Sequence, residues 1–464
     1  MKPALSEVLS LRGLEPPPVD EIEIVGADPV LSTPFKIGEC SASVLAGVGV
    51  AVTDIWEMKT GRRQRVSIDV KRAAAALKSA KYLEQAIGAK DFEPVVNEGR
   101  EATGKMTNPW PTKDGRHFMP HFGLPHLADR VLGILDCEAS ADGVRNAVAK
   151  WDALELEAAI DEARGCGAMV RSNADWLAEP HGQVLQSKPL VEIEKIGDSA
   201  AEPFATDGRP LDGIRVLDLT RILAGPIAAR TLAEHGADVL MVGADGLPQV
   251  PEYVVDTSHG KRSCFLDLKS SDGRDALKSL VSEADVFSQG YRPGILAGHG
   301  FGPEELAELR PGLIYLSISC FGSDGPLSHR AGWEQIGQAV TGICHEGSAE
   351  GPKRLPAAAC DYTTGYLGAY GVLLALARRA REGGSYHVRV SLCQSGMFIY
   401  RQGKLDSVPM DADVDPDVIQ QIRIETTGEA GKFKHLGPVL ALSETRPHWR
   451  RPTPALGADK PVWV

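Results

Sequence analysis

The sequence predicts an α/β fold, with a Rossmann-like parallel sheet in a large domain and a smaller α+β domain beside it. The first observation is a series of short runs rich in Val, Ile and Leu across residues 211–400, each with the composition of a buried strand. The second is that a segment of helical character separates successive runs. Strands that alternate with helices are typical of a parallel sheet covered on both faces.

Residues that start and stop helices mark the elements of this domain in order. The run 214–219 is the first strand, and Pro226 suits the first turn of the helix that follows it, over 227–234. Gly236 ends that helix before the second strand, at 237–242. The further predicted helices are 273–282, 304–309 and the segment after Asp361, and the further predicted strands are 285–289, 313–319 and 386–392.

Changes in composition divide the chain into six parts. Residues 197–210 (GDSAAEPFATDGRP) have no periodicity and several breakers, as a linker should. Both ends are rich in proline and charge, so we expect them to wrap the surface in extended form without adding a core. The predicted parts are an N-terminal extension (1–33), a segment at 34–90, a small α+β domain (91–196), the linker (197–210), the large domain (211–400) and an extended C-terminal tail (401–464).

Residues 34–70 faintly repeat residues 356–392. Both segments read as a helix of small residues, a basic turn ending in glycine and a β run, and their alignment places Glu39 opposite Asp361. The identities are few, and two generic helix–turn–strand units often look alike, so the repeat is weak evidence by itself.

Composition and charge bound the classes of function. The chain has 464 residues, of which 43% are hydrophobic and 24% charged, as in soluble globular proteins. The net charge of −12 argues against a nucleic-acid partner. No run of about 18 apolar residues indicates a membrane helix, and the N-terminus lacks the apolar region of a signal peptide. Eight scattered cysteines are typical of free thiols in a reducing cytosol, so we expect a cytoplasmic protein.

The segment PAAACDYTTGYLGAYG places Asp361 at the start of a predicted buried helix. A carboxylate there faces unpaired backbone N–H groups and the positive end of the helix dipole, which favour its ionised form. Such a carboxylate can attack an activated carbonyl and form a covalent intermediate. Asp is also a preferred helix cap, so the two roles stay open. The neighbouring thiol of Cys360 is a second possible nucleophile, although a small buried filler fits it better.

Two further segments fit an anionic ligand. Ala224 and Gly225 follow a strand and begin a helix, where backbone N–H groups can bind an anion or a carbonyl oxygen. Lys261 and Arg262 lie in a compact basic loop suited to phosphates. Taken singly, each segment is better explained as an ordinary turn.

Other common motifs are missing from the sequence. No G-x-G-x-x-G, P-loop, H-E-x-x-H or G-x-S-x-G pattern occurs. Three closely spaced histidines, at positions 117, 121 and 126, lack an acidic or cysteine partner at ligand spacing, so no metal site is predicted.

Together, ordered segments over 211–400 resemble the class III CoA-transferases (the CaiB/BaiF, or carnitine dehydratase/bile-acid-inducible, family), which also include α-methylacyl-CoA racemases. The segments are RVLDLTRILAGPIAARTLAEHGADVLMV, GKRSCFLDLKSSDGRDALKSLVSEADVF, YRPG, LRPGLIYLSISCFGSDGPL and ACDYTTGYLGAYGVLLALARRAREGGSYHVRVSL. In the first half, WPTKDGRHFMPHF is similar to the entry of the family's small domain, which in other members follows the catalytic half. The resemblance therefore implies a permuted order, with 34–90 as a degenerate large-domain segment.

The resemblance also implies roles for individual residues. Asp361 matches the acyl-accepting aspartate, and Glu334 in GWEQ matches an acidic position near the transferase site. Trp333 stands where the racemases carry a catalytic histidine. Two departures concern coenzyme A: MVGADGLPQVPEY lacks the usual Glu-Arg sequence, and Leu223 replaces a polar residue found in some transferases. The expected coenzyme A contacts are Ala224, Gly225, Lys261, Arg262 and Arg292.

The function implied by the resemblance is transfer of coenzyme A from an acyl-CoA to a carboxylate acceptor, through a mixed anhydride and an aspartyl-CoA thioester on Asp361. Acyl-CoA and the acceptor are then substrates, no cofactor is permanently bound, and family members form interlocked homodimers. Two alternatives stay open. One is an isomerase or racemase with Asp361 as the base, and the other is a non-catalytic protein that binds coenzyme A.

Overall fold

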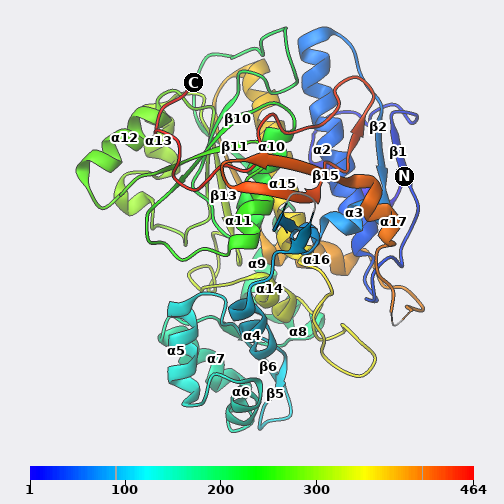
Figure 1. Cartoon of the computed structure of the whole chain (residues 1–464), viewed down its shortest axis with the longest axis vertical. Coiled ribbons are helices and arrows are strands. Elements are labelled where there is room, and N and C mark those ends of the chain that lie inside the picture. The colour runs from blue at the N-terminus through cyan, green and yellow to red at the C-terminus, as the bar shows by residue number, and fades with distance from the viewer. Residues whose placement is uncertain (89–90, 410) are drawn as a thin grey trace.

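The computed structural model describes residues 1–88, 91–409 and 411–464. Residues 89 and 90, at the end of the segment predicted over 34–90, lie outside the described part. Figure 1 shows a large α/β body in the upper part of the view and a smaller domain below it, which contains α5, α6, α7, β5 and β6.

The large body is built on a seven-stranded sheet in the order β11-β10-β9-β12-β13-β14-β8. Six neighbouring strands are parallel, which confirms the predicted parallel-rich sheet, and β8 is an antiparallel edge strand. Numbered along the chain, the six parallel strands have the order 3-2-1-4-5-6 of doubly wound sheets. The strands are β8 (Glu192–Gly197), β9 (Arg215–Asp218), β10 (Asp238–Gly243), β11 (Lys261–Phe265), β12 (Val286–Gln289), β13 (Ile314–Ser319) and β14 (Ser385–Ser391).

Helices cover both faces of this sheet. Alternate residues of β9 divide between two hydrophobic cores, Val216 in the one that contains α10 and α15 and Leu217 in the one that contains α12 and α13. The helices are α10 (Ala224–Glu234), α11 (Pro251–Thr257), α12 (Ser271–Val281), η2 (Ala297–His299), α13 (Pro303–Leu309), α14 (Glu334–Val340), α15 (Ala359–Glu382) and α16 (Leu392–Arg401).

The first part of the chain packs against α15. Helix α2 (Ile37–Thr60) runs along α15, and β1 (Ile22–Val25) pairs in parallel with β2 (Val66–Asp69). Helix α2 is long and apolar enough to cross a membrane, but 94% of its most apolar stretch is buried inside this chain, so it serves as a core helix. The remaining elements are α1 (Pro3–Ser10), α3 (Val70–Ala76), η1 (Ser79–Tyr82), β3 (Glu84–Ala86) and β4 (Phe92–Pro94).

The small domain has its own core, which includes Phe118, Val131 and Leu156. The segment predicted as one helix near 140–163 forms two, because the backbone of Asp152 is extended and the second helix begins at Ala153. The elements are α4 (Glu98–Met106), β5 (Trp110–Pro111), β6 (His117–Pro120), α5 (Pro125–Leu135), α6 (Ala141–Val148), α7 (Ala153–Glu162), β7 (Gly167–Met169), α8 (Asn173–Ala178) and α9 (Pro180–Gln186).

The two ends of the chain contain more regular structure than we predicted. Both were expected to be extended, but α1 and β1 form in the first 33 residues, and the tail contains α17 (Pro416–Ile422), β15 (Arg423–Gly428), β16 (Gly431–Leu436) and β17 (Ala441–Leu442). Strand β16 pairs with β3, and Ile419, Ile422 and Leu436 are buried. The prolines do not prevent this, because none of them lies within β15 or β16, which pair with each other. Trp449 and Trp463, beyond the hairpin, still pack on the large domain.

Candidate active site

Asp361 is the third residue of α15 and lies inside the first helical turn. The capping position belongs to Ala358, and no side chain caps the helix from there, so the structure does not use Asp361 as the predicted cap. Its side chain is buried, and the residue is only 8% exposed. The carboxyl group is therefore available for another role.

Glu334, the first residue of α14, holds the start of α15. Its carboxylate accepts hydrogen bonds from the backbone N–H groups of Cys360 (3.2 Å) and Asp361 (2.5 Å), and from the side-chain amide of Gln338 (2.6 Å). Glu334 is buried as well. The structure thus brings the two predicted catalytic residues together, and it shows that Glu334 supplies the missing helix cap from a distant element.

Burial and mutual repulsion set the charge of this pair. Burial raises the pKa of Asp361 well above its usual range, the neighbouring Glu334 raises it further, and Arg100 opposes both effects. Burial also raises the pKa of Glu334 to about 7, although its hydrogen bonds to Gln338 and to the backbone N–H groups work in the opposite direction. Because the two carboxyl groups repel each other, the charge of one raises the pKa of the other.

The thiol beside Asp361 does not compete as a nucleophile. Cys360 is fully buried, and burial, followed by the charges of Glu334 and Asp361, raises the pKa of its thiol. A protonated thiol is a poor nucleophile. All eight cysteines are free, and among the described residues no group of His, Cys, Asp and Glu is arranged to hold a metal ion.

The small domain reaches this site through His121. Its ring lies 4.5 Å from the ring of Trp333, the residue directly before Glu334. The backbone N–H of Gly123 donates to Nδ1, and Nε2 lies 3.1 Å from Oε1 of Gln335. Burial lowers the pKa of His121 to about 3, so the ring is neutral and both of its nitrogens are occupied.

Arg100 of α4 is a second contribution of the small domain, and sequence reasoning missed it. Its Nη1 lies 2.5 Å from Oε1 of Glu252, its Nη2 donates to the hydroxyl of Tyr253, and its guanidinium covers the Tyr253 ring at 4.1 Å. No motif surrounds Arg100, so only its position in the fold reveals it.

The start of α10 lies next to the start of α15. A Cβ on Gly365 would approach the carbonyl oxygen of Ala224 to 2.5 Å, which shows how closely the two helices approach each other. Gly225 also has no room for a side chain, since a Cβ there would lie 2.3 Å from the side chain of Thr220. Ile222, in the turn before α10, has a φ of 74°, a strained value for a β-branched residue. Ala224 therefore lies against α15, and the oxyanion role of Ala224 and Gly225 stays a prediction.

Lys261 and Arg262 are used inside the protein. The ammonium of Lys261 is 2.7 Å from Asp218 and 2.9 Å from the carbonyl oxygen of Pro226, and the residue is only 1% exposed. Arg262 donates to the carbonyl oxygen of Val462 (2.8 Å) and to Asp238 (3.2 Å). In contrast to the expectation, neither cation is free to meet a phosphate of coenzyme A.

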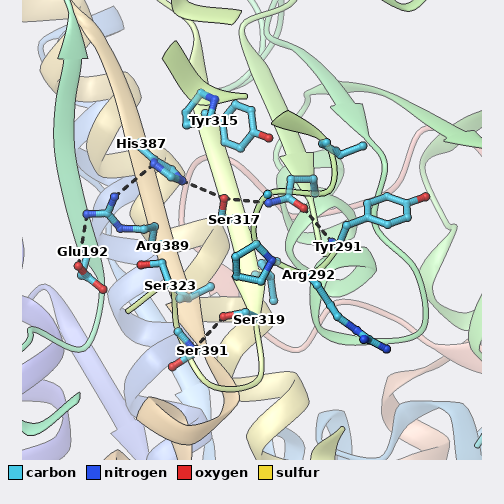
Figure 2. Close-up of a pocket in the computed structure, with 18 of the residues that line it drawn as sticks. Glu192, Tyr291, Arg292, Tyr315, Ser317, Ser319, Ser323, His387, Arg389 and Ser391 are labelled. Atoms are coloured by element: carbon cyan, nitrogen blue, oxygen red, sulfur yellow. Dashed lines mark hydrogen bonds and ion pairs between the residues drawn. The ribbon is translucent and has the colours of Figure 1, made fainter. Parts of the chain in front are cut away.

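Arg292 lines a cavity of about 150 Å³ at the carboxyl ends of β12, β13 and β14. A chain of hydrogen bonds crosses it, with Gln289 Nε2 3.0 Å from Ser317 Oγ, which is 2.8 Å from His387 Nε2. Figure 2 shows the Arg292 side chain directed away from this chain. Because α15 packs on Leu316 and the cavity is lined by Ser317, the cavity lies on the face of the sheet opposite α15.

The segment that contains Asp361 and Glu334 is similar to known proteins. Residues 211–413 match the model of CoA-transferase family III. The acetyl-coenzyme A transferase nodX of Hypoxylon pulicicidum is 35% identical over 323 residues, 64% of this chain and 54% of that protein. The human succinyl-CoA:glutarate CoA-transferase is 36% identical over 202 residues, 40% of this chain and 46% of that protein. The chain spans about half the length of these relatives.

Among solved structures, a CAIB/BAIF family protein from Brucella suis is 32% identical, with 41% of this chain and 55% of that chain covered and a TM-score of 0.38. The family match covers the six parallel strands, α10 and Asp361. Residues 211–413 are therefore a CoA-transferase family III (CaiB/BaiF) domain.

Proposed function

We propose that the protein is an acyl-CoA:carboxylate CoA-transferase in which Asp361 is the covalent nucleophile. The observation that carries this proposal is the buried pair of Asp361 and Glu334 at the start of α15, inside a CoA-transferase family III domain. Curated relatives named as succinyl-CoA:glutarate and succinyl-CoA–L-malate transferases support a carboxylate acceptor.

The reaction needs four exchanges at carbonyl carbons. An oxygen of the Asp361 carboxylate attacks the thioester carbonyl, the C–S bond breaks, and coenzyme A leaves as a thiolate from a mixed anhydride. The thiolate attacks the aspartyl carbonyl, which releases the donor carboxylate and forms an aspartyl-CoA thioester. The acceptor carboxylate then attacks that thioester, the C–S bond breaks, and the thiolate leaves from a second mixed anhydride. The thiolate attacks the acceptor acyl carbon of this anhydride, which forms the new acyl-CoA and frees the Asp361 carboxylate. One thioester replaces another, so little net driving force is needed.

The structure indicates which N–H groups could stabilise the oxyanions. The N–H groups of Cys360 and Asp361 already donate to Glu334, so they are not free for this role. The start of α10, at Ala224 and Gly225, contacts α15 closely and is the better candidate. Glu334 then acts mainly by fixing the backbone of the nucleophile.

One observation favours the isomerase alternative, because a buried carboxylate with a raised pKa can serve as a base near neutral pH. Racemisation needs a second base on the opposite face of the α-carbon. Trp333 cannot accept a proton, and the neighbouring His121 has both nitrogens engaged and a pKa lowered to about 3. We therefore expect no α-proton exchange from an (R)- or (S)-2-methylacyl-CoA in deuterated water.

The remaining expectations are proposals from the family resemblance. They are a Rossmann-like large domain, a homodimer, a cytoplasmic location and a permuted domain order, with residues 34–90 derived from a second large-domain segment. Helices α2 and α15 have the same length, 24 residues, and each is followed by a glycine and a β-strand. This likeness supports the proposal that residues 34–90 derive from a second large-domain segment.

The test is incubation with labelled acyl-CoA and a panel of carboxylates, followed by hydroxylamine trapping of the acylated residue. We expect coenzyme A transfer to at least one acid and modification of Asp361. Rapid α-proton exchange that depends on Asp361 would favour the isomerase. Binding of coenzyme A with neither reaction would identify a non-catalytic binding protein.

A further inference from the structure

The second substrate of the proposed transfer is a carboxylate, and the two acidic residues at the start of α15 repel it. Asp361 and Glu334 are both buried, and the backbone N–H of Asp361 donates to the Glu334 carboxylate, so an acceptor acid brings a third carboxyl group. Like charges in a buried site repel strongly, so the acceptor needs a cation close to Asp361. Lys261 and Arg262 are bound to other partners.

Arg100 is held close to this pair by α11. Its guanidinium rests on the ring of Tyr253, one turn before Asp256. Ser79 joins the carboxylate of Asp256 (2.6 Å) to the hydroxyl of Tyr362 (2.9 Å), the residue that follows Asp361. Helix α11 therefore links Arg100 to the first turn of α15.

A second contact places α4 across the approach to α15. Nη2 of Arg354, in the segment that leads into α15, donates to the carbonyl oxygen of Gly104 in α4 at 3.3 Å. Figure 1 shows α4 where the small domain meets the large body, beside α14. Electrostatics agrees with this placement, because Arg100 is the positive charge that lowers the pKa of Asp361.

The contacts of Arg100 leave part of its donor set free. Nη1 bonds Glu252 and Nη2 bonds Tyr253, so Nε–H and one N–H on each Nη have no acceptor among the described side chains. The side chain is 42% exposed, whereas the Glu252 side chain is 7% exposed. Glu252 and Tyr253 thus orient a partly exposed guanidinium that keeps unbonded N–H donors, a suitable arrangement for a carboxylate.

We propose that Arg100 binds the carboxylate of the acceptor acid beside Asp361. This inference rests on the proposed function, since it assigns the second substrate of that reaction. Glu252 and Tyr253 preorganise the guanidinium, and the small domain thereby supplies the acceptor site while the large domain supplies the nucleophile.

The test separates the two substrates kinetically. Loss of a charge-assisted hydrogen bond in Arg100→Gln should raise KM for the acceptor acid about 10- to 100-fold, with KM for acyl-CoA unchanged. Acylation of Asp361 in this variant should move to higher pH, because a charge that lowers the pKa of Asp361 is lost. Arg100→Lys retains the charge and should restore the acylation profile but only part of the acceptor affinity.

Two controls distinguish binding from a merely structural contact. Glu252→Gln removes the negative partner but leaves the guanidinium on the Tyr253 ring, so acceptor KM should rise less than in Arg100→Gln, whereas a structural role of the ion pair predicts the same loss in both variants. Arg145→Gln, an exposed arginine stacked on Trp110 in the small domain, should leave both constants unchanged. Normal acylation with unchanged acceptor KM in Arg100→Gln would overturn this inference alone. Absence of acylation at Asp361 in the native protein would overturn the proposed function and this inference with it.

Discussion

Helices α2 and α15 are two versions of one arrangement within the same molecule. Each has 24 residues, carries an acidic residue at its third position (Glu39 and Asp361) and ends at a glycine (Gly61 and Gly383). In both, a carboxylate from another element accepts the N–H of that acidic residue. Asp28 binds Glu39 at 2.8 Å, and Glu334 binds Asp361 at 2.5 Å.

The two acidic residues differ in their surroundings. The Glu39 side chain is 22% exposed and lies 3.1 Å from the ammonium of Lys2. Asp361 is buried, and no ion pair to it occurs among the described residues. The same backbone arrangement thus gives a solvated ion pair in one helix and a desolvated carboxylate in the other, and desolvation beside a like charge is what makes a carboxyl group reactive.

The sharpest test of this comparison exchanges the two acids for amides. Asp361→Asn should lower coenzyme A transfer by about a thousandfold or more, because it removes the nucleophile. Glu39→Gln, the matched control, should leave the rate within about twofold, since surface changes are usually mild. The measurement is transfer of label from acyl-CoA to a carboxylate. Full activity in Asp361→Asn would remove Asp361 from the mechanism.

The caps of the two helices should affect the pH dependence differently. Burial and the charge of Glu334 both raise the pKa of Asp361, so acylation should become faster as pH rises. Glu334→Gln removes the like charge, lowers that pKa and should move the profile to lower pH. Asp28→Asn, the corresponding change at α2, should leave it in place. Single-turnover acylation between pH 5 and pH 9 checks this, and an unmoved profile in Glu334→Gln would contradict the proposed coupling.

The raised pKa of Asp361 should also make the stability of the protein depend on pH. Because the pKa of Asp361 is raised on folding, its protonated form contributes stability at low pH, which is lost as pH rises through the folded-state value. Asp361→Asn cannot lose this contribution, so its Tm should exceed that of the native protein by more at pH 9 than at pH 5. Thermal unfolding at both values measures the difference, and a constant gap would show that Asp361 does not titrate on folding.

The ion pair at α2 should have the smallest effect. Exposed pairs contribute about 0–1 kcal/mol, so Lys2→Ala should lower the free energy of unfolding by less than about 1 kcal/mol. A double-mutant cycle with Glu39→Gln isolates the interaction. A coupling energy well above that range would mean that the Lys2–Glu39 pair stabilises the protein more than an exposed ion pair does.

The strands and helices of the large domain could be predicted because their signals are local. Apolar runs, Pro226 and Gly236 lie within the elements that they define, and the structure places β9, α10 and β10 where these signals indicated. Asp361 was found from its place at a predicted helix start, and Glu334 from the family resemblance. Their contact follows from the fold, since 27 positions separate them.

Long-range partners account for what the sequence did not predict. Residues 192–197 alternate as a strand does, but nothing local shows that β8 joins β14 at the edge of the main sheet. The hairpin of β15 and β16 is stable in the tail because β16 pairs with β3, far away in the chain. Arg100 lies in a polar segment without a motif, and only its contacts with Glu252 and Tyr253 give it a role.

The sequence by itself determined which segments form the sheet and its helices, and that an acidic residue begins α15, because periodicity, helix breakers and first-turn residues act over a few positions. The tertiary structure decided the chemistry of that residue. The pKa of Asp361, in α15, depends on its burial, on Glu334 of α14 and on Arg100 of α4. Only folding brings these three helices together. The effect of a charge depends on its distance in space and on exposure to solvent, so the order of residues along the chain does not determine the pKa of Asp361.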